Sequence, residues 1–195
     1  MRRILLDKKK GEIPFIPLTV RRVEASAFKT LGFHKHHYLR QDINPSCKCF
    51  LFEWNNQPVG FVGVLNSPRK GIPFSMSISR IVILPDYQGL HLSRRLCNFI
   101  GGIFKSLSND KDDYRIYIKT AHQKMGQSLS NDTENWRGTA FDGKGRTKEA
   151  TEYDNHKYAN RLTRVSYCKE YIGKPIYGYE DLLLPISEMR QKMHI

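Results

Sequence analysis

The chain has 195 residues, of which 39% are hydrophobic and 11% aromatic, a composition typical of one globular domain. A chain of this length can bury roughly 70% of its unfolded surface, so it needs neither disulfides nor a metal to form a core. No apolar run approaches the about 20 residues that span a bilayer. Only Ile4, Leu5 and Leu6 follow the basic start, too few for a signal peptide. We therefore expect a cytoplasmic protein with no membrane partner.

The net charge of +13 and the pI near 9.7 indicate a polyanionic partner, because clustered Lys and Arg release counterions from nucleic acid. A basic surface without a specialised role is the alternative. We expect a basic arm over residues 1–12, a folded domain over residues 13–195, and nucleic acid, DNA above all, as the partner. Trp136 lies in a polar stretch and is the candidate for stacking on a base, although core packing is the simpler explanation for most rings. The residues expected to contact nucleic acid are Lys8, Lys9, Lys10, Lys35, Arg40, Trp136 and Arg137.

The first third of the chain predicts strands around a hairpin. Residues 16–23 favour a strand, residues 24–31 a short helix, and residues 34–40 a polar, His-rich loop or helix start. Residues 49–54 are apolar and aromatic, and residues 58–65 resume the same character after a polar turn. These two stretches therefore predict a β-hairpin.

The middle of the chain changes from strand to helix periodicity. Residues 75–84 are strongly β-branched and predict a strand. In residues 92–107 the apolar positions fall on one helical face, which predicts an amphipathic helix. Residues 114–120 alternate as a strand, and residues 121–130 favour a short helix.

The last third of the chain carries weaker signals. Residues 131–158 are polar and contain glycine, and their pattern assigns them to no element. Residues 161–172 predict a late strand, and residues 180–184 a final edge segment of the sheet. Strands that alternate with helices in this way predict an α/β domain with helices on the faces of one sheet.

One segment of the chain joins a buried strand to a helix through a tight turn, over residues 79–96. The first N–H groups of a helix have no partners within the helix, so they can bind an anion. Arg94 and Arg95 lie in the first turn, where their charges oppose the helix dipole unless an anion binds there. An ordinary strand–turn–helix with a solvated Arg pair is the alternative.

This segment resembles the central motif of the GNAT acyltransferase superfamily, a strand, a loop of the form Q/R-x-x-G-x-G/A and a helix. Gln88 stands at the first position, and His91 and Ser93 stand where the family has glycines. The resemblance implies a single α/β domain with a central mixed, mostly antiparallel sheet flanked by helices. It also implies acetyl-CoA or another acyl-type donor, whose pyrophosphate the loop amides bind in that family. The implied cofactor contacts are Ile81, Val82, Ile83, Gln88, Gly89, Leu90, His91, Leu92, Ser93 and Arg94.

Two narrower resemblances involve the same segment. The first is to the GNAT-like domain fused to certain ABC-type ATPases, over residues 33–39, 58–61 and 79–89. The second is to the phage Mom-type proteins, GNAT-fold enzymes that modify adenine in phage DNA and so block restriction. It rests on residues 78–81, Ser93 with Leu96, and residues 120–122.

Five polar residues are candidates for the chemistry of group transfer, which needs a base, a proton donor and a group that stabilises negative charge. His37 and Tyr38 form one candidate pair, and a surface His cluster is the alternative. Arg80 lies on a buried strand, where a structural salt bridge is the alternative. Ser93 can instead cap its helix. His122 follows a strand at a position where open sheets bind ligands.

The cysteines and histidines also allow a metal site to be considered. His34, His36 and His37 lie close in sequence to Cys47 and Cys49, but their spacing is not that of a zinc finger. We therefore predict no metal. All four cysteines should be free thiols, with Cys97 and Cys168 in the core.

Together, these features predict a GNAT-fold transferase that modifies a nucleic-acid base, with Mom-like adenine modification in phage or prophage anti-restriction as the leading interpretation. One alternative is an acetyl-CoA-dependent N-acetyltransferase of a protein or small amine. Another is a non-catalytic module that binds nucleic acid.

Overall fold

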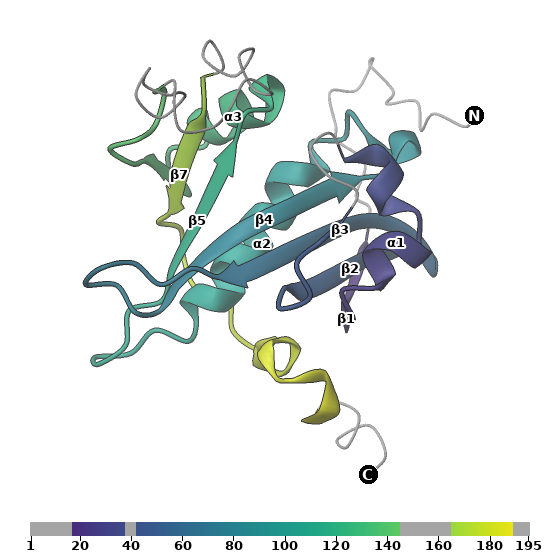
Figure 1. Ribbon diagram of the computed structural model, residues 1–195, viewed down its shortest axis with the longest axis horizontal. Coiled ribbons are helices and arrows are strands. Elements are labelled where there is room, and N and C mark those ends of the chain that lie inside the picture. The colour runs from purple at the N-terminus through teal and green to yellow at the C-terminus, as the bar shows by residue number, and fades with distance from the viewer. Residues whose placement is uncertain (1–16, 38–41, 145–164, 189–195) are drawn as a thin grey trace, which may run out of the picture.

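The computed structural model describes residues 17–37, 42–144 and 165–188, and these form one sheet with helices on its faces (Figure 1). The predicted basic arm, Tyr38 and Arg40 lie outside the described residues. The strands are β1 (Thr19–Val23), β2 (Lys48–Trp54), β3 (Gln57–Asn66), β4 (Ser75–Ile83), β5 (Arg115–Thr120), β6 (Trp136–Gly138) and β7 (Tyr167–Tyr171). The helices are α1 (Ala27–Thr30), α2 (Leu92–Lys105) and α3 (Gln123–Ser130), with 3-10 turns η1 (Phe33–His36), η2 (Pro85–Tyr87) and η4 (Glu180–Leu183).

The seven strands lie in the order β1-β2-β3-β4-β5-β7-β6. Every neighbouring pair is antiparallel except β4 and β5, which are parallel. Parallel neighbours require a long crossover connection, and α2 provides it. The predicted fold, a mixed and mostly antiparallel sheet flanked by helices, is therefore confirmed.

Two apolar cores cover the two faces of the sheet, with α1 and α2 on opposite sides (Figure 1). The larger core lies under α2, whose Leu96, Ile100 and Phe104 are at most 3% exposed. This helix also contains Gly101, where an added Cβ would lie 2.5 Å from the Tyr171 ring. Only glycine therefore allows β7 to approach the helix this closely.

The smaller core lies under α1 and η1 and contains Phe28, Phe33 and Phe61. The rings of Phe28 and Phe33 both pack on Phe61, with centroids 5.2 and 5.4 Å apart. This packing ties the first helical segments to β3. It therefore fixes the His-rich stretch above the sheet.

The C-terminal segment differs from the prediction. Residues 180–184 form the 3-10 turn η4 and not an edge strand of the sheet. Three leucines in succession cannot alternate between core and solvent as a strand requires. The turn instead packs Leu182 and Leu183 against the larger core. In the stretch that the sequence left unassigned, residues 136–138 form the short strand β6.

The four cysteines are free, as predicted, and all four are buried. Cys97 is fully buried and Cys168 is 8% exposed, so both lie in the core. Within the described ranges, no helix combines the length and the apolar character needed to cross a membrane.

Candidate active site

The sheet opens between β4 and β5. Their parallel ladder joins residues 75–78 to residues 115–118, and beyond this point β4 pairs with β3 alone and β5 with β7 alone. Figure 1 shows the two strands diverging toward their carboxyl ends. At the same place the register of β4 shifts, because Gly63 pairs with Arg80 and Val64 with Ile78, which leaves Ser79 as an extra residue. Such a bulge bends the strand and redirects its side chains.

Beyond the bulge, β4 offers backbone groups to the opening. Leu84 donates its N–H to the Val59 carbonyl at 2.9 Å, so this residue faces β3. Backbone groups alternate along a strand, so Ile81 and Ile83 face the edge that β5 has left. The Ile83 carbonyl accepts a hydrogen bond from Gln88 Nε2 at 2.9 Å. The Val82 side chain is buried in the core on the α1 face.

The loop after β4 keeps the backbone of a glycine-rich turn. Gly89 and His91 have φ values of +89° and +56°, both left-handed. For a residue other than glycine, this conformation costs roughly 1–2 kcal/mol. The His91 side chain is exposed, and an added Cβ at Gly89 would meet nothing within 4 Å. The loop surface is therefore open, and its shape tolerates the histidine.

Helix α2 begins directly at this loop. Its first internal hydrogen bond runs from the Arg95 N–H to the His91 carbonyl at 3.5 Å, so the preceding N–H groups lack partners within the helix. Leu90 and Leu92 are 5% and 4% exposed and anchor the loop in the core. Ser93 is half-buried in the first turn. These N–H groups can therefore bind an anion.

Arg94 lies within ion-pair distance of a carboxylate of the protein, that of Asp132. Its Nε lies 3.7 Å from Asp132 Oδ2, and the same carboxylate accepts a hydrogen bond from Asn98 Nδ2 at 2.8 Å. The charge of Arg94 is thus shared with a carboxylate, while Arg95 is exposed.

Arg80 lies at the bulge, on the α1 face of the sheet. Its Nη1 donates to the Ser79 carbonyl at 2.8 Å and its Nη2 to the Asp42 carbonyl at 3.2 Å. Its Nε is buried without a hydrogen-bond partner, and no carboxylate of the described ranges forms an ion pair with it. The structural salt bridge considered from the sequence is therefore not found in this part of the chain. The half-buried guanidinium is held by two carbonyls and retains its Nε–H as a donor for an additional acceptor.

His37 lies close enough to Arg80 to sense its charge. Burial and, to a smaller extent, the charge of Arg80 together lower the pKa of His37 from 6.5 to about 4. The ring packs against Phe28 edge-on, with centroids 6.3 Å apart. His37 is therefore neutral at neutral pH and can accept a proton. Its predicted companion Tyr38 lies outside the described residues.

The depressed pKa of His37 should appear as acid sensitivity. Between pH 6.5 and about 4 the unfolded chain binds a proton at this residue and the folded chain does not. The free energy of unfolding therefore decreases as the pH is lowered through this range. We expect the wild type to lose more stability than His37→Gln between pH 7 and pH 4.5, measured by urea unfolding. His36→Gln, an exposed neighbour, should behave as the wild type does. Equal losses in all three proteins would contradict the prediction.

His122 caps a helix. Its Nδ1 accepts the Met125 N–H at 3.3 Å at the start of α3, and its own N–H donates to Thr120 Oγ1 at 3.1 Å. It follows β5, whereas Arg80 lies on β4. The His122 side chain thus caps α3, and its predicted catalytic role stays a prediction.

The residues predicted to contact nucleic acid divide into several groups. Lys35 is exposed, and Arg137 is exposed but donates to Glu170 Oε2 at 2.8 Å.

The prediction that Trp136 stacks on a base is wrong, because this residue is 2% exposed. Its Nε1 donates to Asn98 Oδ1 at 2.6 Å, and its ring packs on Tyr171. Pairing of β6 with β7 turns the ring inward. Lys8, Lys9, Lys10 and Arg40 lie outside the described residues.

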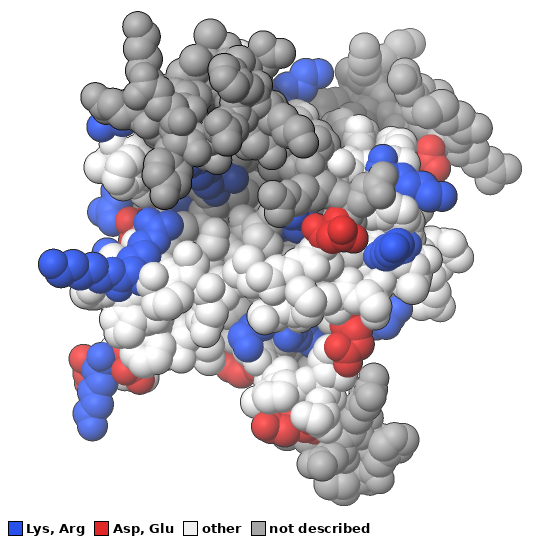
Figure 2. Space-filling model, viewed as in Figure 1, with Lys and Arg blue, Asp and Glu red and all other residues white. Residues whose placement is uncertain are grey.

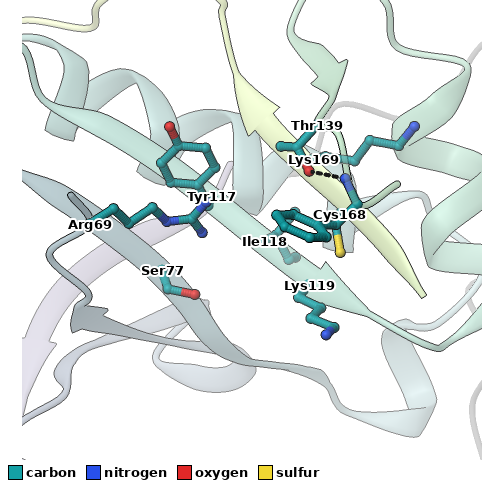
Figure 3. Close-up of a pocket in the computed structure, with 9 residues that line it drawn as sticks. Arg69, Ser77, Tyr117, Ile118, Lys119, Thr139, Cys168 and Lys169 are labelled. Atoms are coloured by element: carbon teal, nitrogen blue, oxygen red, sulfur yellow. Dashed lines mark hydrogen bonds between the residues drawn. The ribbon is translucent and has the colours of Figure 1, made fainter. Parts of the chain in front are cut away.

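A pocket of about 260 Å³, which no sequence motif indicates, lies beside the opening (Figure 3). Met76, Ile116 and Ile118 point into the core under α2, so Ser77, Tyr117 and Lys119 point to the opposite face. Strand alternation alone predicts this grouping. The pocket is lined by Arg69, Ser77, Tyr117, Ile118, Lys119, Thr139, Phe141, Cys168 and Lys169.

Among the described His, Cys, Asp and Glu side chains, no group of three or more is placed to hold a metal ion.

Comparison with known proteins agrees with this geometry. Residues 19–123 match the model of the acetyltransferase (GNAT) family, and this span contains β1 to β5, the opening and α2. No curated protein sequence matches the chain significantly.

Solved structures share the fold at low sequence identity. The ribosomal-protein-S18-alanine N-acetyltransferase from Escherichia coli superimposes with a TM-score of 0.54 at 9% identity, covering 83% of this chain and 98% of that one. The spermidine/spermine N-acetyltransferase from Vibrio cholerae, solved with manganese ions, gives a TM-score of 0.52 at 13% identity, covering 78% and 91%. The likeness extends over most of each chain.

Proposed function

Because the chain belongs to the acetyltransferase (GNAT) family, we propose that it transfers an acetyl group from acetyl-CoA to the nitrogen of an amine. The observation that carries this proposal is the open edge of β4 that leads directly to the N-terminus of α2. Both are backbone features, so they tolerate the loss of the two family glycines.

The residues around the opening fit acetyl-CoA. The N–H groups at the start of α2 and the open surface at Gly89 suit its pyrophosphate. The backbone groups that Ile81 and Ile83 turn toward the opening suit its amide-containing arm. When bound, acetyl-CoA supplies an acyl group activated as a thioester.

His37 and Arg80 are the chain's own candidates for the chemistry. In the transfer, a bond forms between the amine nitrogen and the acetyl carbon, the thioester bond breaks, and the amine loses a proton. His37 is neutral at neutral pH, so its imidazole can accept that proton. The unpartnered Nε–H of Arg80 can stabilise negative charge that develops on oxygen. Tyr38, the other member of the candidate pair, is proposed to donate a proton to the leaving sulfur.

Binding of acetyl-CoA tests the proposal directly. We expect calorimetry to show a complex, and His91→Gly to bind more tightly, because a glycine lets the donor approach the backbone more closely. The same change should stabilise the protein by roughly 1 kcal/mol, since it relieves the left-handed conformation. Arg95→Gly, at an ordinary helical position, should cost about 1 kcal/mol instead. If neither the wild type nor His91→Gly binds acetyl-CoA, acetyl-CoA is excluded as the donor.

Modification of a nucleic-acid base is the second candidate function, and the Mom-like interpretation belongs here. The net charge of +13 favours an anionic acceptor over a cationic one. Mass spectrometry of nucleosides from cells that express the protein tests this candidate, because a new nucleoside would reveal the transferred mass. Strong DNA binding without any binding of acetyl-CoA would indicate the non-catalytic module instead.

A further inference from the structure

We propose that the pocket beside the opening is an acceptor subsite that holds the phosphate of a nucleotide unit. The inference rests on the proposed function for one point only, that the acceptor amine enters the opening between β4 and β5. It adds the chemical class of the acceptor, an amine carried on a phosphate-bearing molecule.

Two cations of the pocket, Arg69 and Lys119, have no carboxylate partner among the described residues. Lys169, in contrast, forms an ion pair with Asp142. Burial raises the pKa of Cys168 in the pocket wall, and the charges of Lys119 and Arg69 oppose that rise. Both cations therefore act on the same small space. Figure 2 shows several Lys and Arg residues on the side of the molecule where the β3–β4 loop and β7 lie in Figure 1, and others on the opposite side.

The arginine is held in place before any ligand binds. Arg69 and Ile72 exchange two backbone hydrogen bonds, at 3.1 and 2.8 Å, which close the tip of the β3–β4 loop. The guanidinium carbon lies 3.7 Å from the centre of the Tyr117 ring, and Figure 3 shows Arg69 lying against that ring. A guanidinium stacked in this way is already ordered, so it loses little further conformational freedom when a ligand binds. Its planar N–H groups suit phosphate oxygens.

The opposite wall is also fixed. Asp142 accepts the Cys168 N–H at 2.8 Å and pairs with Lys169, and Thr139 donates its N–H to the Cys168 carbonyl at 2.9 Å. These bonds attach the turn after β6 to β7. The turn presents Phe141, which is 69% exposed, beside the basic residues. An exposed ring next to phosphate-binding groups is suited to stacking on a base.

The position of the pocket connects it to the proposed chemistry. The last residue pair of the β4–β5 ladder is Ile78 with Ile118, and Lys119 comes directly after it, where the strands part. Ser77 adds a hydroxyl from the neighbouring strand on the same face. A phosphate held here places the rest of the acceptor toward the opening and Arg80. A polycationic amine would be repelled by Arg69 and Lys119.

The test measures binding rather than transfer. A fluorescent single-stranded DNA oligonucleotide is titrated into the wild type and into Arg69→Gln/Lys119→Gln, at several salt concentrations. We expect at least about tenfold weaker binding in the variant, with a salt slope lower by about 1.4, since each phosphate contact on single strands contributes about 0.7. Acetyl-CoA binding should be unchanged, which separates this proposal from the proposed function.

A matched control removes the same charge elsewhere. Lys29→Gln/Lys174→Gln changes two exposed lysines away from the pocket and should bind the oligonucleotide nearly as the wild type does. Equal weakening in both double variants would overturn the subsite, because binding would then follow net charge alone. If AMP displaces the fluorescent oligonucleotide, a free nucleotide is sufficient as the ligand. If only an unlabelled oligonucleotide displaces it, the ligand is a nucleic-acid strand. If the double variant melts early, Lys119→Gln alone repeats the test at an exposed position.

Discussion

Arg80→Gln should reduce the turnover number for acetyl transfer by roughly 100- to 1000-fold while the protein stays folded, a loss typical of removing one charge-stabilising donor. Glutamine keeps a polar side chain at the bulge but loses the positive charge and the buried Nε–H. The remaining partners of Arg80 are two backbone carbonyls, Ser79 and Asp42, so no buried carboxylate is left unpaired by the change. The measurement is steady-state transfer to an amine acceptor, with circular dichroism on the same samples.

The affinity of the protein for DNA should hardly change in Arg80→Gln, because the residue is half-buried and its guanidinium already donates to two backbone carbonyls. Arg21→Gln on the edge strand β1 is the control, since Arg21 is exposed and pairs with Glu53 away from the opening. It should keep full activity. Loss of transfer and DNA binding together, with an unfolded spectrum, would make Arg80 a structural residue. Full activity in Arg80→Gln would remove it from the chemistry.

The sequence predicts the helices and strands in which apolar side chains recur at a regular spacing. Leu96, Ile100 and Phe104 follow the helical period, and α2 begins at Leu92 as that period predicts. The hairpin of β2 and β3 is predicted by its apolar strands and polar turn for the same reason. The helix start and the order of strands around it also follow from the resemblance to the GNAT motif. Regular periodicity is therefore enough for the frame of the site.

The parts that escape prediction depend on contacts between distant segments. Asp42 provides a carbonyl to Arg80 across 38 positions, and no local pattern indicates that pairing. Arg69 lies in a loop whose sequence shows only a turn, yet it stacks on Tyr117 of β5. β6 has three residues, too few to show a period, so no local pattern indicates that the Trp136 ring faces inward. Long-range pairing, which the sequence does not encode locally, decides each of these cases.

The largest loss of stability should follow from Trp136→Ala, at about 3–5 kcal/mol, the range for removing a fully packed large ring. The ring is 2% exposed and packs on Tyr171 with centroids 5.3 Å apart. Trp136→Phe should lose less, because it keeps most of the apolar contact but leaves Asn98 Oδ1 without the indole donor. Urea unfolding monitored by circular dichroism measures all three proteins.

Phe141→Ala supplies the contrast, because this ring is 69% exposed and a surface change of this kind usually stays within about 0.5 kcal/mol. Variants at Trp136 and Phe141 also distinguish a role in core packing from a role in oligonucleotide binding. If stacking on a base belongs to the exposed ring, Phe141→Ala should weaken oligonucleotide binding without unfolding the protein, while Trp136→Phe should bind as the wild type does. A Trp136 variant that is fully stable and yet binds DNA poorly would contradict this assignment, because a ring buried between β6 and α2 can influence binding only through the stability of the fold.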